Sequence, residues 1–221
     1  MKKLINSCFI CIGILIHFQG VAQESAEAKL LLDEVSTKMS SYANMQIIFS
    51  ATFSNEEAGI SEGDEPPLFG EILLQKEKYN LNYLDSNFIF DGKKLYIINH
   101  EEKEVSINEG DFDEEDGFIY PSKLLTFYKT GYTYSMGKIK TIKENKIQFV
   151  TLTPIDSDSE IVDVQLGIDL KTKHIYQLIQ LGSNNAKTIF TITTFKSNQD
   201  LLKNPFHFDK EIYLKNKYSI D

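Results

Sequence analysis

The chain has 221 residues, with 23 basic residues that are all lysine, 32 acidic residues, two cysteines and a formal net charge of −9. A hydrophobic fraction of 42%, with 12% aromatic residues, excludes an intrinsically disordered or fibrous chain. The acidic balance disfavours a binder of nucleic acid or of an anionic membrane, since the long-range field of the protein repels both polyanions.

The N-terminus has the pattern of a secretory signal peptide, residues 1–22. Two lysines precede an apolar run from Leu4 to Phe18 that is short for a membrane span, and Gly20-Val21-Ala22 places small residues before a cleavage site. Cys8 and Cys11 both lie in this segment, and neither follows the pattern of a lipoprotein signal. We therefore expect a single mature domain, residues 23–221, that is exported and free of thiols. Removing Lys2 and Lys3 leaves 21 lysines against 32 acids, a charge of −11.

The mature chain opens with one helical segment and continues mainly as strands. Apolar residues at i, i+4 spacing from Ser25 to Met45 predict an amphipathic helix, and the change to a period of two after Met45 predicts a half-buried strand up to Phe53. The acidic, Gly- and Pro-containing stretch 56–67 is a predicted loop. The apolar stretches that follow predict short strands over 69–75, 79–84, 87–90, 95–99 and 103–107.

The remaining segments alternate between loops and further strands. Asp91-Gly92 predicts a type I′ hairpin turn, and the acid-rich stretch 111–117 predicts a solvated loop. Pro121 opens a second predicted helix, Pro121–Lys129, that Gly131 can cap. Further strands are predicted over 138–142, 146–153, 161–170, 174–181 and 187–195.

This order of elements predicts a mainly β protein with helices, an α+β fold. About ten closely spaced strands without βαβ order favour one large antiparallel sheet. We expect the sheet to curl into an open, incomplete β-barrel, with the helices covering its concave hydrophobic face.

The sequence lacks the motifs of an enzyme. No G-x-S-x-G elbow and no glycine-rich phosphate loop occurs, and His100, His174 and His207 have no metal-ligand spacing. Acid pairs such as Asp156 and Asp158 lie in polar loops and are interpreted as solvated charge. We predict no catalytic residue, no metal and no cofactor.

Several strands carry apolar residues on both faces, for example Phe88, Ile89 and Phe90. A sheet with one wet face needs only one apolar series. Either helices cover the second face, or the concave face and the helices enclose an apolar cavity. The residues alone do not decide between these alternatives.

An ordered set of short segments resembles the LolA family of outer-membrane lipoprotein carriers. The segments are Gly70-Glu71-Ile72-Leu73-Leu74, Tyr79-Asn80-Leu81, Phe90-Asp91-Gly92-Lys93-Lys94-Leu95-Tyr96-Ile97, Glu104-Val105-Ser106-Ile107, Pro121-Ser122-Lys123-Leu124-Leu125, Leu166-Gly167-Ile168-Asp169 and Phe206-His207-Phe208. The composition, with many Asn residues and with lysine but no arginine, is similar to that of a Bacteroidetes-type member. The resemblance implies an open curled sheet, lidded by helices, that holds the acyl chains of a lipoprotein in a hydrophobic cavity.

The resemblance also suggests site residues. The family's arginine that controls the lid aligns with Lys76, a flexible point charge in place of a planar fork, and an aromatic residue at the cavity mouth aligns with Tyr79. Lys76 can equally be interpreted as an ordinary surface lysine beside a turn. Strand parity proposes the following lining of the acyl cavity: Ile72, Leu74, Tyr79, Leu81, Phe88, Phe90 and Leu125.

The implied function is a monomeric periplasmic chaperone that carries lipoproteins from the inner to the outer membrane. Its expected partners are acylated lipoproteins, an inner-membrane lipoprotein-releasing ABC transporter and an outer-membrane acceptor, with no nucleic acid and only transient membrane proximity. The alternative is a periplasmic module of the same fold that senses lipid or lipoprotein. A hydrolase acting on lipid or glycan ranks third, because no motif supports it.

Overall fold

The computed structural model describes residues 23–112, 120–201 and 203–221. The predicted signal peptide and residues 113–117 of the predicted acidic loop therefore lie outside the described part of the chain. The described part of the chain begins with the predicted amphipathic helix, which covers residues 23–40. Ala28, Leu31, Leu32, Val35 and Met39 form its buried stripe. The helix ends five residues before the predicted end at Met45, because Met45 already belongs to the first strand.

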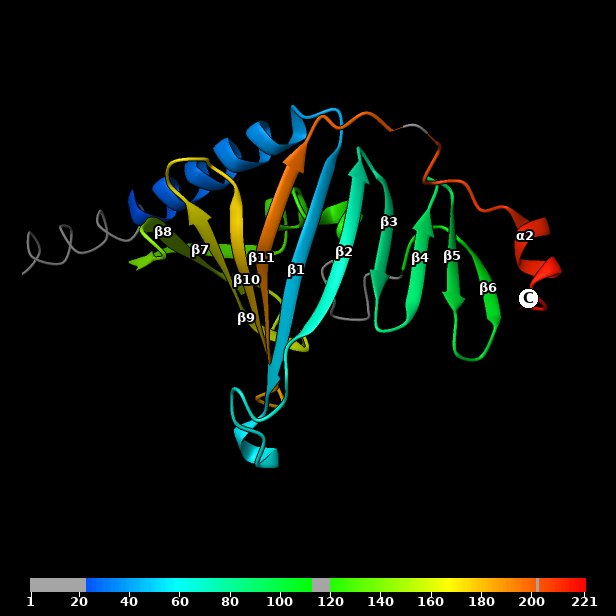
Figure 1. Ribbon diagram of the computed structural model, residues 1–221. Coiled ribbons are helices and arrows are strands. Elements are labelled where there is room, and N and C mark those ends of the chain that lie inside the picture. Colours follow the sequence, from blue (N-terminus) through cyan, green and yellow to red (C-terminus); the bar gives the residue numbers. More distant parts are fainter. Residues whose placement is uncertain (1–22, 113–119, 202) are drawn as a thin grey trace, which may run out of the picture.

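Twelve strands form one continuous sheet in the order β12-β6-β5-β4-β3-β2-β1-β11-β10-β9-β8-β7. Their bounds are β1 Met45–Ser54, β2 Leu68–Gln75, β3 Lys78–Tyr83, β4 Ser86–Phe90, β5 Lys94–Asn99, β6 Glu104–Glu109, β7 Tyr132–Ile142, β8 Asn145–Pro154, β9 Ile161–Asp169, β10 Ile175–Gly182, β11 Lys187–Ser197 and β12 Ser219–Ile220. All neighbours are antiparallel except β12 and β6, which run parallel. The meander β1 to β6 joins the meander β7 to β11 through the pairing of β1 with β11, so the two halves of the chain meet at the centre of the sheet (Figure 1).

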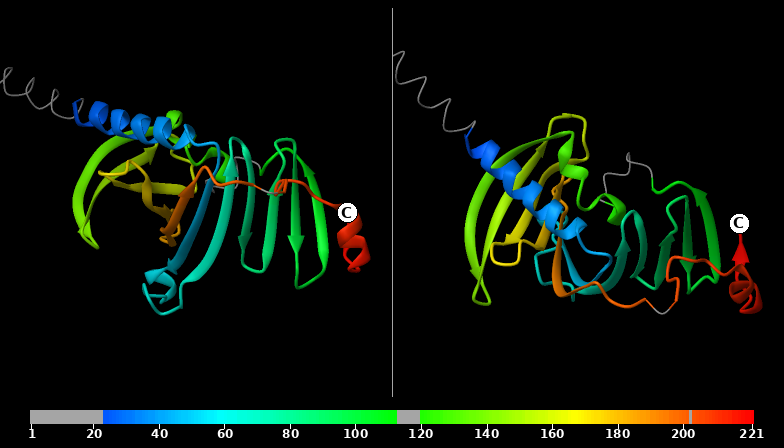
Figure 2. Two further views of the ribbon diagram at one scale, coloured as in Figure 1. Left: turned by 45° about the horizontal axis from the view of Figure 1, so that its top comes forward. Right: turned by 90° about the horizontal axis from the view of Figure 1, so that it is seen from above.

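The sheet is open and curled, as predicted. β7 and β12 stand at opposite ends of the strand order and do not pair with each other. The strands from β1 through β11 to β7 curve beneath the N-terminal helix, and β3 to β6 continue as a flatter wing (Figure 2). Mostly β content with few helices and an unclosed curled sheet confirm the predicted fold class.

The second predicted helix, Pro121–Lys129, is wrong as a continuous element. The segment contains two 3₁₀ turns, η3 Pro121–Lys123 and η4 Phe127–Lys129. Thr126, between them, has φ −134° and ψ −19°, outside the helical region, and its side chain makes no capping bond. Isolated helices this short lack the hydrogen bonds to offset nucleation, so packing of individual side chains decides the local conformation.

The predicted type I′ turn at Asp91-Gly92 is also wrong in detail. Only Gly92 has a positive φ, and the Asp91 carboxylate accepts hydrogen bonds from the backbone N–H groups of Lys93 and Lys94 at 2.8 and 2.9 Å. Asp91 thus acts as an Asx-type cap of a three-residue connection. Two consecutive positive φ values, as type I′ requires, occur instead at Leu84-Asp85 and Lys143-Glu144.

The apolar convex face of the wing is covered by the C-terminal segment. Ile89, Ile98 and Val105 form a separate buried cluster. The residues packed against this cluster include Phe208, Tyr213, Tyr218 and Ile220. They come from helix α2 Lys210–Lys215, from β12 and from the residues next to these elements. The apolar residues on the second face of β4 to β6 are therefore explained by a covering segment, without a ligand.

Candidate functional site

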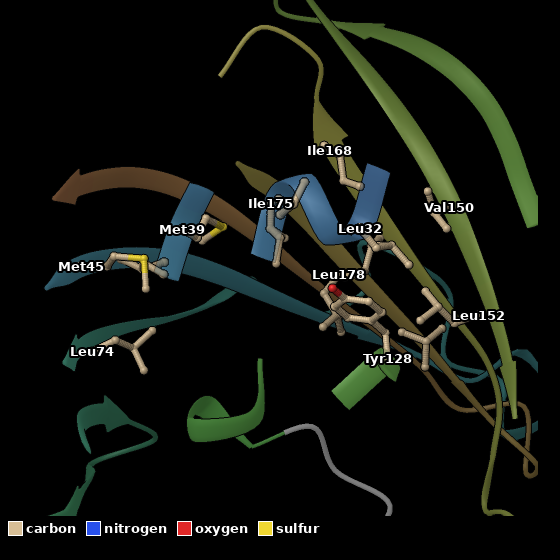
Figure 3. Close-up of a cluster of buried hydrophobic side chains, with 14 of the residues drawn as sticks. Leu32, Met39, Met45, Leu74, Tyr128, Val150, Leu152, Ile168, Ile175 and Leu178 are labelled. Carbon is tan, nitrogen blue, oxygen red and sulfur yellow. The ribbon is translucent and has the colours of Figure 1, made fainter. Parts of the chain in front are cut away.

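The concave face and the N-terminal helix enclose the main apolar region of the molecule. Leu32 and Met39 on the helix meet strand residues such as Met45, Leu74, Val150 and Leu178, with Tyr128 of η4 beside them (Figure 3). All of these side chains are less than 9% exposed. Helix and 3₁₀ turns together act as a roof over the curled sheet.

Two of the cavities formed by the described residues lie under this roof. The larger has a volume of about 500 Å³ and lies where the end of the helix, the β2–β3 turn and η3 meet. Its lining is mixed: Met39, Ser40, Tyr42, Asn44, Met45, Leu74, Lys76, Glu77, Phe90, Asp111, Pro121, Ser122, Lys123, Leu125 and Thr126. A ligand in this cavity would meet thioether and hydrocarbon groups as well as amide, hydroxyl and charged groups.

The second cavity, of about 110 Å³, is nearly all apolar. Its walls are Ile47, Phe49, Ile72, Leu81, Pro121, Leu124, Ile175, Leu178, Gln180, Phe190 and Ile192. Pro121 borders both cavities, so the 3₁₀ turn η3 separates the mixed region from the apolar one. Glycine at position 70 makes room for one wall, because a Cβ there would lie 2.3 Å from the Phe49 Cζ atom.

All seven residues proposed to line an acyl cavity lie on the core side of the sheet or its roof. Ile72, Leu74, Tyr79 and Phe90 belong to the main buried cluster, and Leu81, Phe88 and Leu125 pack against it. Leu74, Phe90 and Leu125 border the larger cavity, and Ile72 and Leu81 border the smaller one. Tyr79 and Phe88 border neither of the two.

Tyr79 holds the β6–β7 connection to the sheet. Its side chain is fully buried, and its hydroxyl donates to the Asp111 carboxylate at 2.7 Å. The Ser122 hydroxyl donates to the second oxygen of the same carboxylate, and the Phe112 backbone N–H donates to the first at 3.0 Å. Burial and the adjacent carboxylate raise the pKa of Tyr79 far above its ordinary value. Asp111 thus clamps both described ends of this connection onto β3, although the sequence suggested only a solvated loop here.

Lys76 occupies the two-residue turn between β2 and β3, not a strand. It is exposed, its backbone is left-handed with φ 56°, and its side chain lies at the border of the larger cavity. This place fits both interpretations of Lys76 from the sequence, a turn lysine and a residue near the mouth.

A tyrosine hydroxyl joins η4 to the N-terminal helix. The buried Tyr128 of η4 donates its hydroxyl to the Asp33 carboxylate of the helix at 2.8 Å, and the Tyr134 hydroxyl of β7 donates to the Tyr128 carbonyl oxygen at 2.6 Å. Lys29 pairs with Asp33 at 2.7 Å. Hydrogen bonds from Lys29 and Tyr128 lower the pKa of Asp33.

The helix and the residues that follow it are tied to the β9–β10 turn. The Tyr42 hydroxyl lies 2.9 Å from His174 Nε2, and the Glu34 carboxylate pairs with Lys173 at 2.8 Å. Burial and the nearby Lys38 lower the pKa of His174, so that its neutral form prevails at neutral pH. His174 therefore has a structural partner.

Several lining residues were not predicted from the sequence. Phe49 on β1 and Phe190 and Ile192 on β11 lie in predicted strands, but the sequence does not tell that β1 and β11 pair at the centre of the sheet. Met39 lies in the predicted helix. Period-two alternation in the two strands is the signal that could have identified Phe49, Phe190 and Ile192.

Comparisons with known proteins find structures of similar fold but identify no family for this chain. No family model and no curated protein matches the chain. An uncharacterized conserved protein from Thermus thermophilus has a solved structure similar to this one. The match has a TM-score of 0.57 at 9% identity and covers 88% of this chain and 98% of that one. The likeness concerns the fold alone.

Two further solved structures are more distant. A putative outer membrane lipoprotein-sorting protein domain from Vibrio parahaemolyticus matches at 10% identity with a TM-score of 0.42, covering 85% of this chain and 96% of that one. A LolA superfamily protein from Nitrosomonas europaea matches at 9% identity with a TM-score of 0.39, covering 79% and 94%.

The described residues around the two cavities combine apolar and polar groups. Among the described residues, no group of three or more His, Cys, Asp and Glu side chains could hold a metal ion. The described residues also contain no helix of the length and apolar character needed to cross a membrane. The arrangement offers an apolar compartment next to a mixed one, which suits an amphiphile whose chains and polar end need different surroundings.

Proposed function

We propose that this protein is a periplasmic carrier that shields the acyl chains of lipoproteins between the inner and outer membranes and performs no catalysis. The observation that carries the proposal is the pair of cavities between the concave face and the helical roof, one almost wholly apolar and one mixed. Exposing an acyl chain to water costs about 0.8 kcal/mol per methylene, so an enclosing sheet with a removable roof is the arrangement that such cargo needs.

The proposal requires export and a donor. The N-terminal pattern of residues 1–22 supports delivery across the inner membrane. The proposed donor is a lipoprotein-releasing ABC transporter, and an outer-membrane acceptor would receive the cargo. Because the apolar surface lies inside the roofed sheet, the loaded protein can cross water as a monomer.

The experiment is recovery of cargo from the native compartment. Protein purified from its own periplasm is analysed by native mass spectrometry, and purified protein is added to spheroplasts to test whether lipoproteins are released. We expect acylated lipoproteins in complex with the carrier and release that depends on its addition. Repeated recovery of empty protein, together with no release, contradicts the proposal.

A matched pair of substitutions on one hairpin tests the site itself. Leu81→Gln places an amide in the wall of the smaller cavity, whereas Leu84→Gln changes the exposed β3–β4 turn, where the side chain is 58% exposed. We expect Leu81→Gln to reduce cargo recovery severalfold and Leu84→Gln to leave it unchanged, with both variants folded by circular dichroism. Retention of cargo by a folded Leu81→Gln variant would remove the smaller cavity from the site.

A further inference from the structure

The acidic surface of this chain is unevenly distributed along the strands. Three connections meet at one end of the sheet: residues 55–67 after β1, 155–160 after β8 and 183–186 after β10. Asn55 bonds to the Asn184 carbonyl oxygen, and the Ser183 N–H donates to the Glu160 carbonyl oxygen at 2.8 Å. The first two connections carry eight exposed acids: Glu56, Glu57, Glu62, Asp64, Glu65, Asp156, Asp158 and Glu160. This is the lower end of the molecule in Figure 1.

The opposite ends of β7 to β10 carry lysine instead. We call Lys138, Lys140, Lys143, Lys146 and Lys171 the lysine edge; all five are exposed. The β7–β8 and β9–β10 turns adjoin, because the Leu170 N–H donates to the Lys146 carbonyl oxygen at 3.0 Å. Within the described part of the chain, none of the five forms an ion pair. The acid inside the β7–β8 turn is Glu144, and Glu34 of the neighbouring helix is engaged by Lys173.

The two ends are electrically independent at physiological salt. The ten residues of β8 span about 30 Å at about 3.3 Å per residue, which is several Debye lengths of about 8 Å. A surface that approaches the lysine edge therefore meets local positive charge, and the acids at the far end are screened. The net charge of −11 repels a polyanion only at long range, and the separation of charge orients the molecule with its lysines forward.

Protection of a sheet edge does not account for these lysines. Charged side chains on an end strand prevent pairing with another chain, and that function can explain Lys138 and Lys140 on β7. Lys143, Lys146 and Lys171 lie in or beside turns, where no strand edge is open, and they need another reason.

We propose that the lysine edge docks on the surface of an anionic phospholipid bilayer. Lysine is depleted in protein–protein interfaces, and its flexible, hydrated ammonium lacks the fork of arginine for specific pairing, whereas a diffuse anionic headgroup layer suits several independent point charges. Ile139, 55% exposed between Lys138 and Lys140, adds an apolar side chain at interfacial depth. Because Lys173 and His174 of the β9–β10 turn hold the helix, docking brings the roof and its cavities to the membrane.

Vesicle binding of the purified protein without lipoprotein tests this inference separately from the carrier function. The vesicles are phosphatidylcholine alone or phosphatidylcholine mixed with phosphatidylglycerol. Each lysine near an anionic surface contributes about 1 kcal/mol, a factor of about five, so the triple variant Lys143→Gln, Lys146→Gln, Lys171→Gln should bind the anionic vesicles roughly a hundredfold more weakly. The control is Lys203→Gln, Lys210→Gln, Lys215→Gln near the C-terminus, which changes the net charge equally at exposed positions and should bind like the parent.

A second readout reports which end touches the lipid. The expected mature chain, residues 23–221, contains no cysteine, so an environment-sensitive dye can be attached at a single position, through Ile139→Cys or, at the acidic end, through Ile155→Cys, where the native side chain is 67% exposed. We expect an apolar shift of dye emission only for Ile139→Cys and only with anionic vesicles. Absence of anionic-vesicle binding, equal loss in both triple variants, or a shift at Ile155→Cys overturns the proposal.

Discussion

Tyr128 and Asp33 form the contact that distinguishes this roof from one held by arginine. Arginine would offer a permanently charged fork, whereas here a phenol donates to a carboxylate at 2.8 Å and a second phenol, from Tyr134, supports the carbonyl of the first. The sequence could not indicate this pair, because Asp33 and Tyr128 are 95 residues apart and neither stands in a recognisable motif. The resemblance directed attention to Lys76, which lies in a turn.

Tyr128→Phe should loosen the helix in a pH-dependent way. The folded pKa of Asp33 is lowered, so its interactions stabilise the fold above the unfolded pKa of about 3.9 and lose this effect as the pH falls through the folded pKa. We expect Tyr128→Phe to cost about 1 kcal/mol of unfolding free energy at neutral pH, and progressively less as the pH falls through the lowered pKa of Asp33. Tyr134→Phe is the control, since its acceptor is a backbone carbonyl that does not titrate. Denaturant unfolding at several pH values measures both variants, and parallel pH profiles would contradict the assignment.

Gly70→Ala should displace the aromatic wall of the smaller cavity. The new Cβ would lie 2.3 Å from Phe49 Cζ, a separation that only movement of the ring or strand can relieve. We expect a loss of about 1–3 kcal/mol in unfolding free energy, the usual cost of overpacking. In a Phe49→Leu background the same substitution should cost much less. An equal cost in both backgrounds in a double-mutant cycle would show that the strain does not come from this ring.

At the scale of elements, alternation and spacing predicted the strands well, and tertiary context decided the rest. The helix over residues 23–40 and the run of strands follow from periodicity, because each element buries one stripe or face. The segment Pro121–Lys129 has helical composition but forms two 3₁₀ turns, and its consecutive leucines border different cavities, Leu124 the smaller and Leu125 the larger. The two residues of β12 pair with residues of β6 that lie 115 positions earlier in the chain, and β12 is too short for any pattern.

The N-terminal helix offers a matched pair of leucines for testing its role as a roof. Leu32 is 2% exposed and packs on the sheet, whereas Leu30 is 62% exposed. We expect Leu32→Ala to cost about 2–5 kcal/mol of unfolding free energy through the cavity it leaves, and Leu30→Ala to cost less than about 0.5 kcal/mol. Leu32→Ala should also increase binding of an apolar fluorescent dye at neutral pH. Similar effects of the two variants would mean that the helix does not cover the sheet as described.

For the whole molecule, the pairing of β1 with β11 and the C-terminal cover were beyond the sequence. A period-two pattern shows which residues lie on each face of a strand. It does not show which other strand pairs along its edge, because that strand can lie far away in the sequence. The apolar residues on the second face of β4 to β6 were therefore compatible with either a cavity or a covering helix. On the convex side, the C-terminal segment covers them. The concave side keeps its two cavities.

The size of these cavities predicts that cargo must move the roof. About 40 methylenes of a triacylated cysteine need about 1,200 Å³ if each fills the ~30 Å³ that one water occupies in the liquid. The two cavities offer about 500 and 110 Å³. A single short chain could enter with the helix in place, but three chains could not. Tyr128 of η4 bonds to Asp33 of the helix, and Lys173 of the β9–β10 turn pairs with Glu34. Because the helix must leave these contacts to admit such cargo, its amides should lose protection from hydrogen exchange when a triacylated lipopeptide binds.

Hydrogen exchange with a series of lipopeptides measures this effect. The protein is saturated with lipopeptides of one peptide sequence bearing one, two or three acyl chains, and exchange is followed in residues 23–40 and, as an internal control, in β4 to β6. We expect exchange in the helix to rise with the number of chains, and exchange in the wing to stay constant, because its convex face is held by the C-terminal segment. Saturating binding of the triacylated lipopeptide with a fully protected helix would show that the cargo lies elsewhere than beneath it.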